Sequence, residues 1–258
     1  MDKEFLYDML RTPSVSGHEI ALQKKVIQHM EPVADEILTD ATGDVISVLN
    51  PHAEAKVLLC GHIDEIGFLV TRICEDGMLK VTKAGGIHPV LYLGTHVQVV
   101  CASQILPGVV VTNRTLESKE QVQVEDLFID LGFDSKAECE RYVSIGDPVC
   151  AASEFTELAH GKLAGRALDD RIGAFIILEA LKKAKQKQAA CGIYAATTCG
   201  EETTMRGAYH VATRVQPSCA LIVDVTFASD YPGVSGDASG TVKLGGGAVL
   251  CSNSMINK

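Results

Sequence analysis

Four short polar segments of the sequence carry residue types that can bind cations or move protons. Each lies next to an apolar run. The segments are GHIDEIG with His62 and Asp64, GRALDDRIG with Asp169 and Asp170, CGEETT with Glu201 and Glu202, and LIVDVT with Asp224. Imidazole and carboxylate groups are the protein ligands of hydrolytic divalent ions, and a carboxylate that binds no ion can act as a general base. These segments therefore predict a hydrolytic metal site.

His62 and Asp64 lie two residues apart on a segment predicted to be extended, so their side chains point to the same face. A metal-bound imidazole usually donates its other N–H to a carboxylate, which fixes the tautomer and the orientation of the ring. The spacing therefore suits a metal ligand and its supporting residue. The alternative interpretation is a strand that leaves the core through a polar turn.

The acidic residues can be explained by metal binding or by ordinary structural roles, and the balance between the two differs from pair to pair. Asp169 and Asp170 precede a predicted helix, where acidic residues cap the N-terminus and complement the dipole, so capping accounts for this pair when it is considered alone. Glu201 and Glu202 also precede a helix, but adjacent carboxylates repel each other unless a cation or proton lies between them. Asp224 lies in an apolar run predicted to be a strand, and a buried carboxylate is costly unless it is paired or binds a metal. For Asp224 the functional interpretation is favoured.

The elements that must position these residues follow an α/β pattern. Apolar periodicity predicts helices over 3–10 and 17–31, with Ser16 as the N-cap of the second, and a buried strand from residue 57 to the polar turn at His62. Beyond residue 163 helices and strands alternate: helix 171–187, strand 191–198, helix 206–214 and strand 219–226. This order predicts a parallel or mixed sheet covered by helices. Ligands bind at the carboxyl ends of such strands, so the polar segments are expected to share one crevice.

Residues 68–163 have a different sequence pattern, with short β-rich segments separated by Gly, Pro and Asn turns. This is typical of a small antiparallel barrel or sandwich, here interrupted by one helix in DSKAECERYV. We therefore predict a discontinuous catalytic α/β domain formed by 1–67 and 164–258, with a β domain inserted at 68–163.

Composition narrows the class of protein further. The chain has 258 residues, 47% hydrophobic and 22% charged, with no apolar run long enough to span a bilayer and no secretory signal visible, which predicts a soluble cytoplasmic protein. Nine cysteines without a CxxC pair are interpreted as reduced, buried, small hydrophobes. The net charge of −10 disfavours nucleic acid and anionic membranes as partners and suits carboxylates gathered around cations.

The ligand types favour two divalent ions, Zn²⁺, Co²⁺ or Mn²⁺, about 3.5–4 Å apart with a shared carboxylate and a shared water. From the residues alone, one member of the pair Glu201 and Glu202 is expected to bind metal. The other is expected to take the proton from water and deliver it to the leaving amine.

These segments, together with PSVSGHE and DATGDV, resemble the TET-type metallo-aminopeptidases, a family that includes glutamyl aminopeptidases and proteins once labelled endoglucanase M. The resemblance implies a zinc-peptidase-like fold, a dimerisation role for the β insertion, and dimers that assemble into dodecamers. It also implies a cis peptide bond after Asp169. The site residues that it implies are His62, Asp169 and Asp224 for one metal, Asp169 and Glu202 for a second, Glu201 as general base, and Asp64 as the support of His62.

The sequence departs from this family in one respect. The family completes its second metal site with a further histidine near its C-terminus, but no histidine follows His210 here. The expectation is a shortened chain with one fairly complete metal site, one deficient site and an exposed sheet edge. Seven histidines outside the matched motifs are interpreted as surface or structural residues: His18, His29, His52, His88, His96, His160 and His210.

Two functions of different classes follow. The first is a metallo-aminopeptidase that removes N-terminal residues from peptides, and the alternative is a catalytically deficient metal-binding or assembly subunit. Glycan hydrolysis is disfavoured because the chain has no Trp and 5% aromatic residues for stacking against sugars. The preferred N-terminal residue of a substrate and the identity of the metal are not encoded in these motifs.

Overall fold

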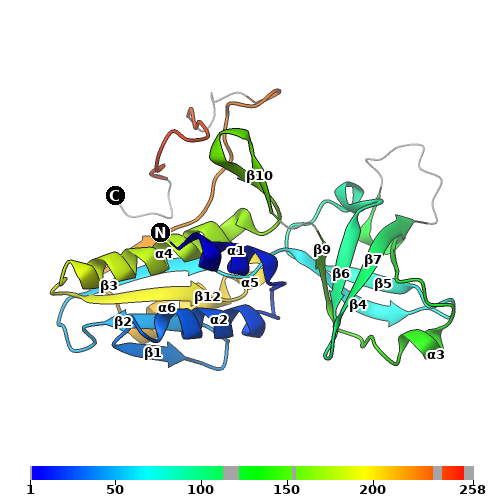
Figure 1. Cartoon of the computed structure of the whole chain (residues 1–258), viewed down its shortest axis with the longest axis horizontal. Helices are drawn as coiled ribbons and strands as arrows, with labels where there is room; N and C mark the ends of the chain where they lie inside the picture. Colours follow the sequence, from blue (N-terminus) through cyan, green and yellow to red (C-terminus); the bar gives the residue numbers. More distant parts are fainter. Residues whose placement is uncertain (1, 113–121, 153–154, 235–239, 253–258) are drawn as a thin grey trace. The chain divides into compact units, whose positions relative to one another are not determined.

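The computed structural model describes residues 2–112, 122–152, 155–234 and 240–252. The chain divides into two units, Met1–Asp224 and Val225–Lys258. The first unit holds all the helices and strands named below, and it confirms the predicted fold class of a mixed α/β sheet with an inserted barrel (Figure 1).

The central sheet has five strands in the order β1-β2-β12-β3-β13. Their bounds are β1 Glu36–Thr39, β2 Val45–Leu49, β12 Gly192–Thr198, β3 Lys56–His62 and β13 Cys219–Ile222. β3 is parallel to both β12 and β13, whereas β2 is antiparallel to β1 and β12. Thr198 pairs with His62, so β12 and β3 end at the same edge of the sheet. The chain segments that follow these two strands are therefore neighbours.

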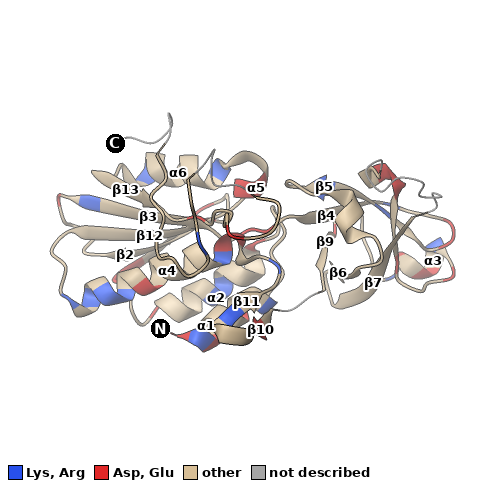
Figure 2. Cartoon of the chain, turned by 90° about the horizontal axis from the view of Figure 1, so that it is seen from above, with Lys and Arg blue, Asp and Glu red and all other residues tan. Residues whose placement is uncertain are grey.

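Helices cover both faces of this sheet, because its inner strands are apolar on both sides. In β2, Val45 and Leu49 belong to one hydrophobic cluster and Ile46 and Val48 to another, as the period of two requires. The first cluster is shared with helices α1 (Lys3–Arg11), α2 (Ile20–Met30) and α4 (Leu168–Gln186), and the second with α6 (Arg206–Val215). Acidic residues begin α4 and basic residues end it (Figure 2), which suits the helix dipole.

The inserted barrel is closed, with strands in the order β4-β5-β8-β7-β6-β9 and every pair antiparallel. Its strands are β4 Gly67–Ile73, β5 Leu79–Ala84, β6 His96–Val100, β7 Ile105–Thr112, β8 Leu127–Asp130 and β9 Pro148–Ala151. The remaining short elements are η1 Pro89–Tyr92, η3 Val124–Asp126, α3 Lys136–Cys139, β10 Thr156–Leu158, η4 Ala159–Gly161, β11 Lys162–Ala164 and α5 Glu201–Thr204. β10 and β11 form a separate hairpin, so the barrel strands end at Ala151. α3 is shorter than the helix predicted from DSKAECERYV.

Three local predictions are wrong. The last strand, β13, ends at Ile222 instead of residue 226, which leaves Asp224 exposed instead of buried in a strand. β13 pairs with β3 along one side and lies at the end of the sheet, where Leu221 and Ile222 are 56% and 65% exposed. An apolar run at the edge of a sheet is not covered on both faces, so its composition overstated its burial.

Ser16 does not cap α2, because Glu19 occupies the N-cap position and the Ser16 hydroxyl lies 3.0 Å from that of Thr203. The third correction concerns two cysteines, since Cys219 and Cys251 are exposed and not buried. Among the residues that the structure describes, no helix combines the length and the apolar character needed to cross a membrane.

Candidate active site

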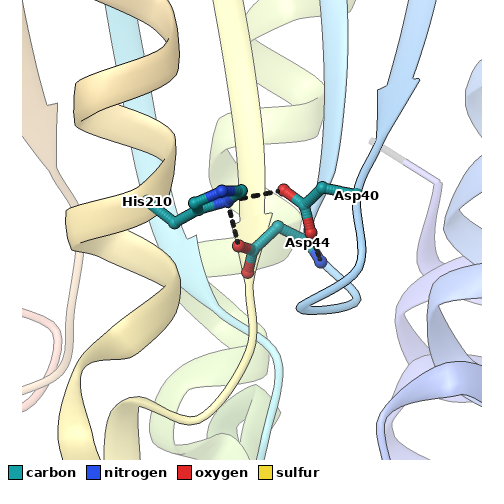
Figure 3. Close-up of side chains that lie close together, drawn as sticks. All are labelled: Asp40, Asp44 and His210. Carbon is teal, nitrogen blue, oxygen red and sulfur yellow. Dashed lines mark hydrogen bonds and ion pairs between the residues drawn. The ribbon is translucent and has the colours of Figure 1, made fainter.

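The described residues contain two groups in which a histidine and two carboxylates each offer a ligand atom within 4.8 Å of the others. One group is Asp40, Asp44 and His210 (Figure 3), which the sequence did not predict to be a site. The other group is His62, Asp169 and Asp224, whose members were all predicted to bind metal. Such groups can hold a divalent cation.

The His62 group is formed at the ends of two parallel strands and at the start of one helix. His62 is the last residue of β3 and is buried, whereas Asp224 follows β13 and is exposed. Asp169 lies in the first turn of α4 with a non-helical backbone, and its peptide bond to Asp170 is cis, as the resemblance implied. The Nε2 atom of His62 lies 3.1 Å from Asp169 Oδ1. The carboxyl edge of the sheet thus gathers residues that are far apart along the chain.

Asp64 contacts His62 and also holds the segment that carries the glutamate pair. The Nδ1 atom of His62 lies 3.1 Å from the backbone oxygen of Asp64 and 3.5 Å from its Oδ1 atom. The Asp64 carboxylate is fully buried and accepts the backbone N–H groups of Glu201 at 3.0 Å and Glu202 at 3.2 Å. With Nδ1 turned toward Asp64, the Nε2 atom faces the two acidic members of the group.

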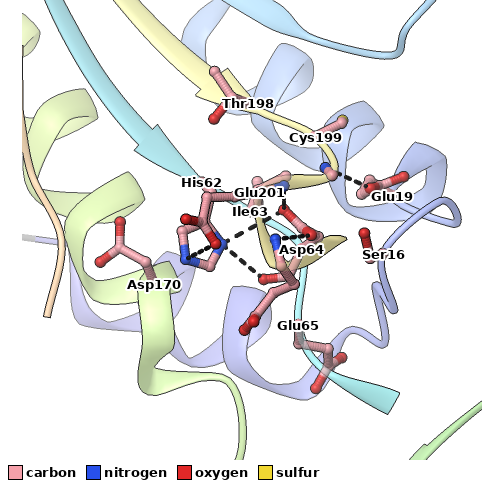
Figure 4. Close-up of polar contacts among 12 residues, drawn as sticks. Ser16, Glu19, His62, Ile63, Asp64, Glu65, Asp170, Thr198, Cys199 and Glu201 are labelled. Carbon is pink, nitrogen blue, oxygen red and sulfur yellow. Dashed lines mark hydrogen bonds and ion pairs between the residues drawn. The ribbon is translucent and has the colours of Figure 1, made fainter. Parts of the chain in front are cut away.

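Four consecutive backbone N–H groups, those of residues 199–202, each donate to a buried carboxylate. Figure 4 shows the contacts to Glu19 and Asp64. In chain order the acceptors are Asp44 Oδ1 at 2.8 Å, Glu19 Oε1 at 3.1 Å, and the two oxygens of Asp64 at 3.0 and 3.2 Å. Hydrogen bonds to charged acceptors are among the strong ones, so three carboxylates fix this loop. Neither Glu19 nor Asp44 was predicted to have a role, although both lie in segments that carried the family resemblance.

The close approach of α6 to this loop requires a glycine at position 207. A Cβ atom there would lie 2.4 Å from Asp44 Oδ1 and 2.7 Å from the backbone oxygen of Cys199. We expect Gly207→Ala to destabilise the fold by about 1–3 kcal/mol despite the better helix propensity of Ala, because this overpacking meets backbone. Thermal unfolding measures the effect. Gly86→Ala is the control, since a Cβ there meets nothing within 4 Å, and equal losses in the two variants would contradict the explanation.

Both glutamates lie near the His62 group, although neither is a member of a ligand group among the described residues. Glu201 Oε2 lies 3.7 Å from His62 Nε2. Burial raises the pKa of Glu202 to about 7, and the negative charge of Asp169 adds to this effect. Burial also raises the pKa of Glu201, although His62 opposes the shift. The site therefore concentrates negative charge that a cation would neutralise.

The two acidic residues at the start of α4 have different roles, and each fits one of the two explanations that the sequence allowed, capping or metal binding. Asp170 is fully buried and its Oδ1 atom accepts the N–H of Gly173 at 3.0 Å, which is a capping role. Its Oδ2 atom has no hydrogen-bond partner in the described part of the chain. Burial, followed by the charge of Asp224, raises the pKa of Asp170 to about 8. Asp169 instead points toward His62, so only one of the two acids belongs to the ligand group.

A buried ion cluster that the sequence analysis missed ties the His62 segment to α4. Glu65 Oε1 lies 2.6 Å from Arg171 and 2.6 Å from Arg166, and Arg171 is fully buried. Arg171 also donates to the backbone oxygen of Met9 and the hydroxyl of Ser14. The signal was present in the sequence, because Glu65 and Arg171 are charged residues next to isoleucines inside two of the singled-out motifs.

Solved structures share this fold. The TET aminopeptidase of a marine sediment archaeon, Thaumarchaeota archaeon SCGC AB-539-E09, is 31% identical, with a TM-score of 0.86 over 93% of this chain and 70% of that one. The TET1 peptidase of Pyrococcus horikoshii, which can assemble into a tetrahedron or a large octahedral shell, is 32% identical, with a TM-score of 0.79 over 89% of this chain and 70% of that one. The fold is therefore that of an aminopeptidase.

The sequence agrees with this class. A lysyl aminopeptidase of Pyrococcus furiosus is 30% identical over 239 residues, which are 88% of this chain and 67% of that protein. The family model described as M42 glutamyl aminopeptidase matches residues 43–258. The chain belongs to this family, and it is a peptidase.

Proposed function

We propose that this chain is a metal-dependent aminopeptidase that removes N-terminal residues from peptides with an activated water and a glutamate as general base. The observation that carries the proposal is the group of His62, Asp169 and Asp224, whose ligand atoms lie within 4.8 Å of one another in a member of the M42 family.

The residues of the site suit a divalent ion. One imidazole and two carboxylates form a mixed nitrogen and oxygen donor set, which Zn²⁺, Co²⁺ and Mn²⁺ accept. In the described part of the chain, one oxygen of buried Asp170 has no hydrogen-bond partner, and burial together with the charge of Asp169 raises the pKa of Glu202. A group of carboxylates in this state favours the binding of cations.

The proposed role of the first group follows the positions of its side chains, since His62, Asp169 and Asp224 would hold one ion. The family resemblance implies that Asp169 with Glu202 would hold a second. When bound, two such ions would supply Lewis-acid chemistry, which polarises a peptide carbonyl and lowers the pKa of a water molecule toward neutrality. Glu201, which lies 3.7 Å from His62, accepts the proton of the attacking water and returns it to the leaving amine. Asp64 orients the imidazole and holds the backbone of both glutamates.

The proposal extends to partners and location. Assembly of the TET1 peptidase into closed shells supports a homo-oligomer for this chain, with the barrel inserted at 68–163 as the dimerisation domain between the catalytic segments 1–67 and 164–258. Peptides are the substrates. A cytoplasmic location is supported by the eight cysteines that precede Cys251, which are free thiols, because reduced thiols are typical of that compartment.

A second candidate is a catalytically deficient metal-binding or assembly subunit. It is favoured by the second ion, for which the proposed ligands are only Asp169 and Glu202. Both candidates bind metal, so turnover separates them.

The test uses aminoacyl anilides as substrates and the metal-stripped chain, to which Zn²⁺, Co²⁺ or Mn²⁺ is added back. We expect release of the anilide from substrates with a free amine, its loss on chelation and its return with added metal. An N-acetylated anilide is the matched control and should resist hydrolysis, because the proposed activity requires a free N-terminus. Metal uptake without turnover would support the deficient subunit and overturn the enzyme mechanism.

A further inference from the structure

The group of Asp40, Asp44 and His210 lies outside the proposed active site and has the geometry of a ligand set. Asp40 and Asp44 flank the turn between β1 and β2, and His210 projects from α6 toward both of them (Figure 3). His210 Nδ1 lies 3.0 Å from Asp40 Oδ2 and 3.8 Å from Asp44 Oδ2. An ion about 2.1 Å from each ligand in tetrahedral geometry separates the ligands by about 3.4 Å. The two observed distances lie on either side of this value.

The backbone of the loops already orients both carboxylates. Asp40 Oδ1 accepts the N–H groups of Thr42 at 3.0 Å and Asp44 at 3.2 Å, which leaves Oδ2 facing His210. Asp44 Oδ1 accepts the N–H of Cys199 at 2.8 Å, which likewise leaves its Oδ2 on the His210 side. Hydrogen bonds from surrounding groups orient metal ligands in this way.

The carboxylate oxygens of Asp40 and Asp44 share one hydroxyl group as a hydrogen-bond donor. The hydroxyl of Thr42 lies 2.6 Å from Asp40 Oδ1 and 2.6 Å from Asp44 Oδ2, but a hydroxyl has one hydrogen to donate. The two carboxylate side chains are 8% and 0% exposed, so water has little access to them. When the hydroxyl hydrogen of Thr42 points to Asp40, the Oδ2 atom of buried Asp44 faces a lone pair of the Thr42 oxygen, and the two oxygens repel each other. A cation beside Asp44 Oδ2 would remove this repulsion.

The nearby arginine does not take the place of a cation in the group. Arg214 approaches Asp40 Oδ2 only to 3.8 Å, and it donates to the backbone oxygen of Thr39 at 3.0 Å. The group also repeats the pattern of the proposed catalytic group, where His62 Nε2 lies 3.1 Å from a carboxylate oxygen of Asp169.

We propose that Asp40, Asp44 and His210 form a second site for a first-row divalent cation, separate from the His62 group. A cation there joins the turn between β1 and β2 to α6. It also acts on the loop at residues 199–202, because the other oxygen of Asp44 holds the N–H of Cys199. The site is thus a structural metal site that stabilises the loop on which Glu201 lies. It does not depend on the proposed aminopeptidase mechanism.

The test counts bound Zn²⁺ in the metal-stripped chain by equilibrium dialysis and elemental analysis. His62→Gln disables the proposed catalytic group, and His210→Gln is added to it. We expect the double variant to bind one equivalent fewer than His62→Gln, or to bind it at least about 10-fold more weakly, because one of three ligands is gone. Zn²⁺ should raise the unfolding temperature of His62→Gln and not that of the double variant. His210 is 46% exposed, so its replacement is compatible with folding.

His52→Gln in the same His62→Gln background is the matched control, since His52 is an exposed histidine outside both groups. It should leave the Zn²⁺ count and the thermal shift unchanged. Equal Zn²⁺ binding with and without His210 would overturn the second site. If His62→Gln alone leaves the count unchanged, the proposed catalytic group fails and the second site is still decided by the double variant.

Discussion

Replacement of Glu201 by Gln is expected to reduce peptide turnover by about 1,000-fold, within the range that a general base contributes. The amide keeps the size of the side chain but cannot accept the proton of the attacking water. The backbone of residue 201 should stay in place, because its N–H is held by buried Asp64. Steady-state hydrolysis of an aminoacyl anilide measures the loss, and elemental analysis of the same sample measures bound metal.

Two further variants give this prediction its controls. Glu202→Gln alters the adjacent proposed ligand, so it should lower metal content together with turnover, whereas Glu201→Gln should leave metal content unchanged. Glu54→Gln changes an exposed glutamate and should affect neither quantity. Turnover that survives in Glu201→Gln at full metal content would show that another group is the base.

Replacement of Glu65 by Ala is expected to lower the free energy of unfolding by about 3–5 kcal/mol, because it leaves a buried charge unpaired. Arg171 is fully buried and loses its 2.6 Å contact to a carboxylate, and Arg166 loses the same partner. The remaining acceptors of Arg171 are neutral oxygens, those of Met9, Leu10 and Ser14. Urea unfolding of the metal-free chain measures the difference, with the midpoint of the transition as the readout.

The matched control is Glu75→Ala, which removes a glutamate from an ion pair at the surface. Glu75 is 91% exposed and lies 3.6 Å from Lys136, so its loss should cost less than about 1 kcal/mol. A loss in Glu65→Ala as small as in this control would mean that Arg171 is compensated by its neutral acceptors alone.

The elements of the α/β part could be predicted to a large extent because their patterns are local. Apolar periodicity located α4, β12 and α6 to within a few residues. Strands β1 and β2 were not predicted, since their four and five residues give little periodicity. The barrel at the insertion was predicted from β-rich pieces, but the separation of the hairpin of β10 and β11 from it depends on which strands pair.

The candidate site shows the same division. The sequence by itself determined that the segments of His62 and Asp224 come together, because parallel strands end at one edge of a sheet and polar residues follow them, whereas Asp169 was added to them by the family resemblance. Only the tertiary structure decided that Asp170 caps α4, and that Asp224 is exposed beyond an edge strand. No pattern in the sequence predicted that the carboxylates of Glu19, Asp44 and Asp64 hold residues 199–202. Their partners lie more than a hundred residues away, and such contacts depend on how the elements pack and not on any local pattern.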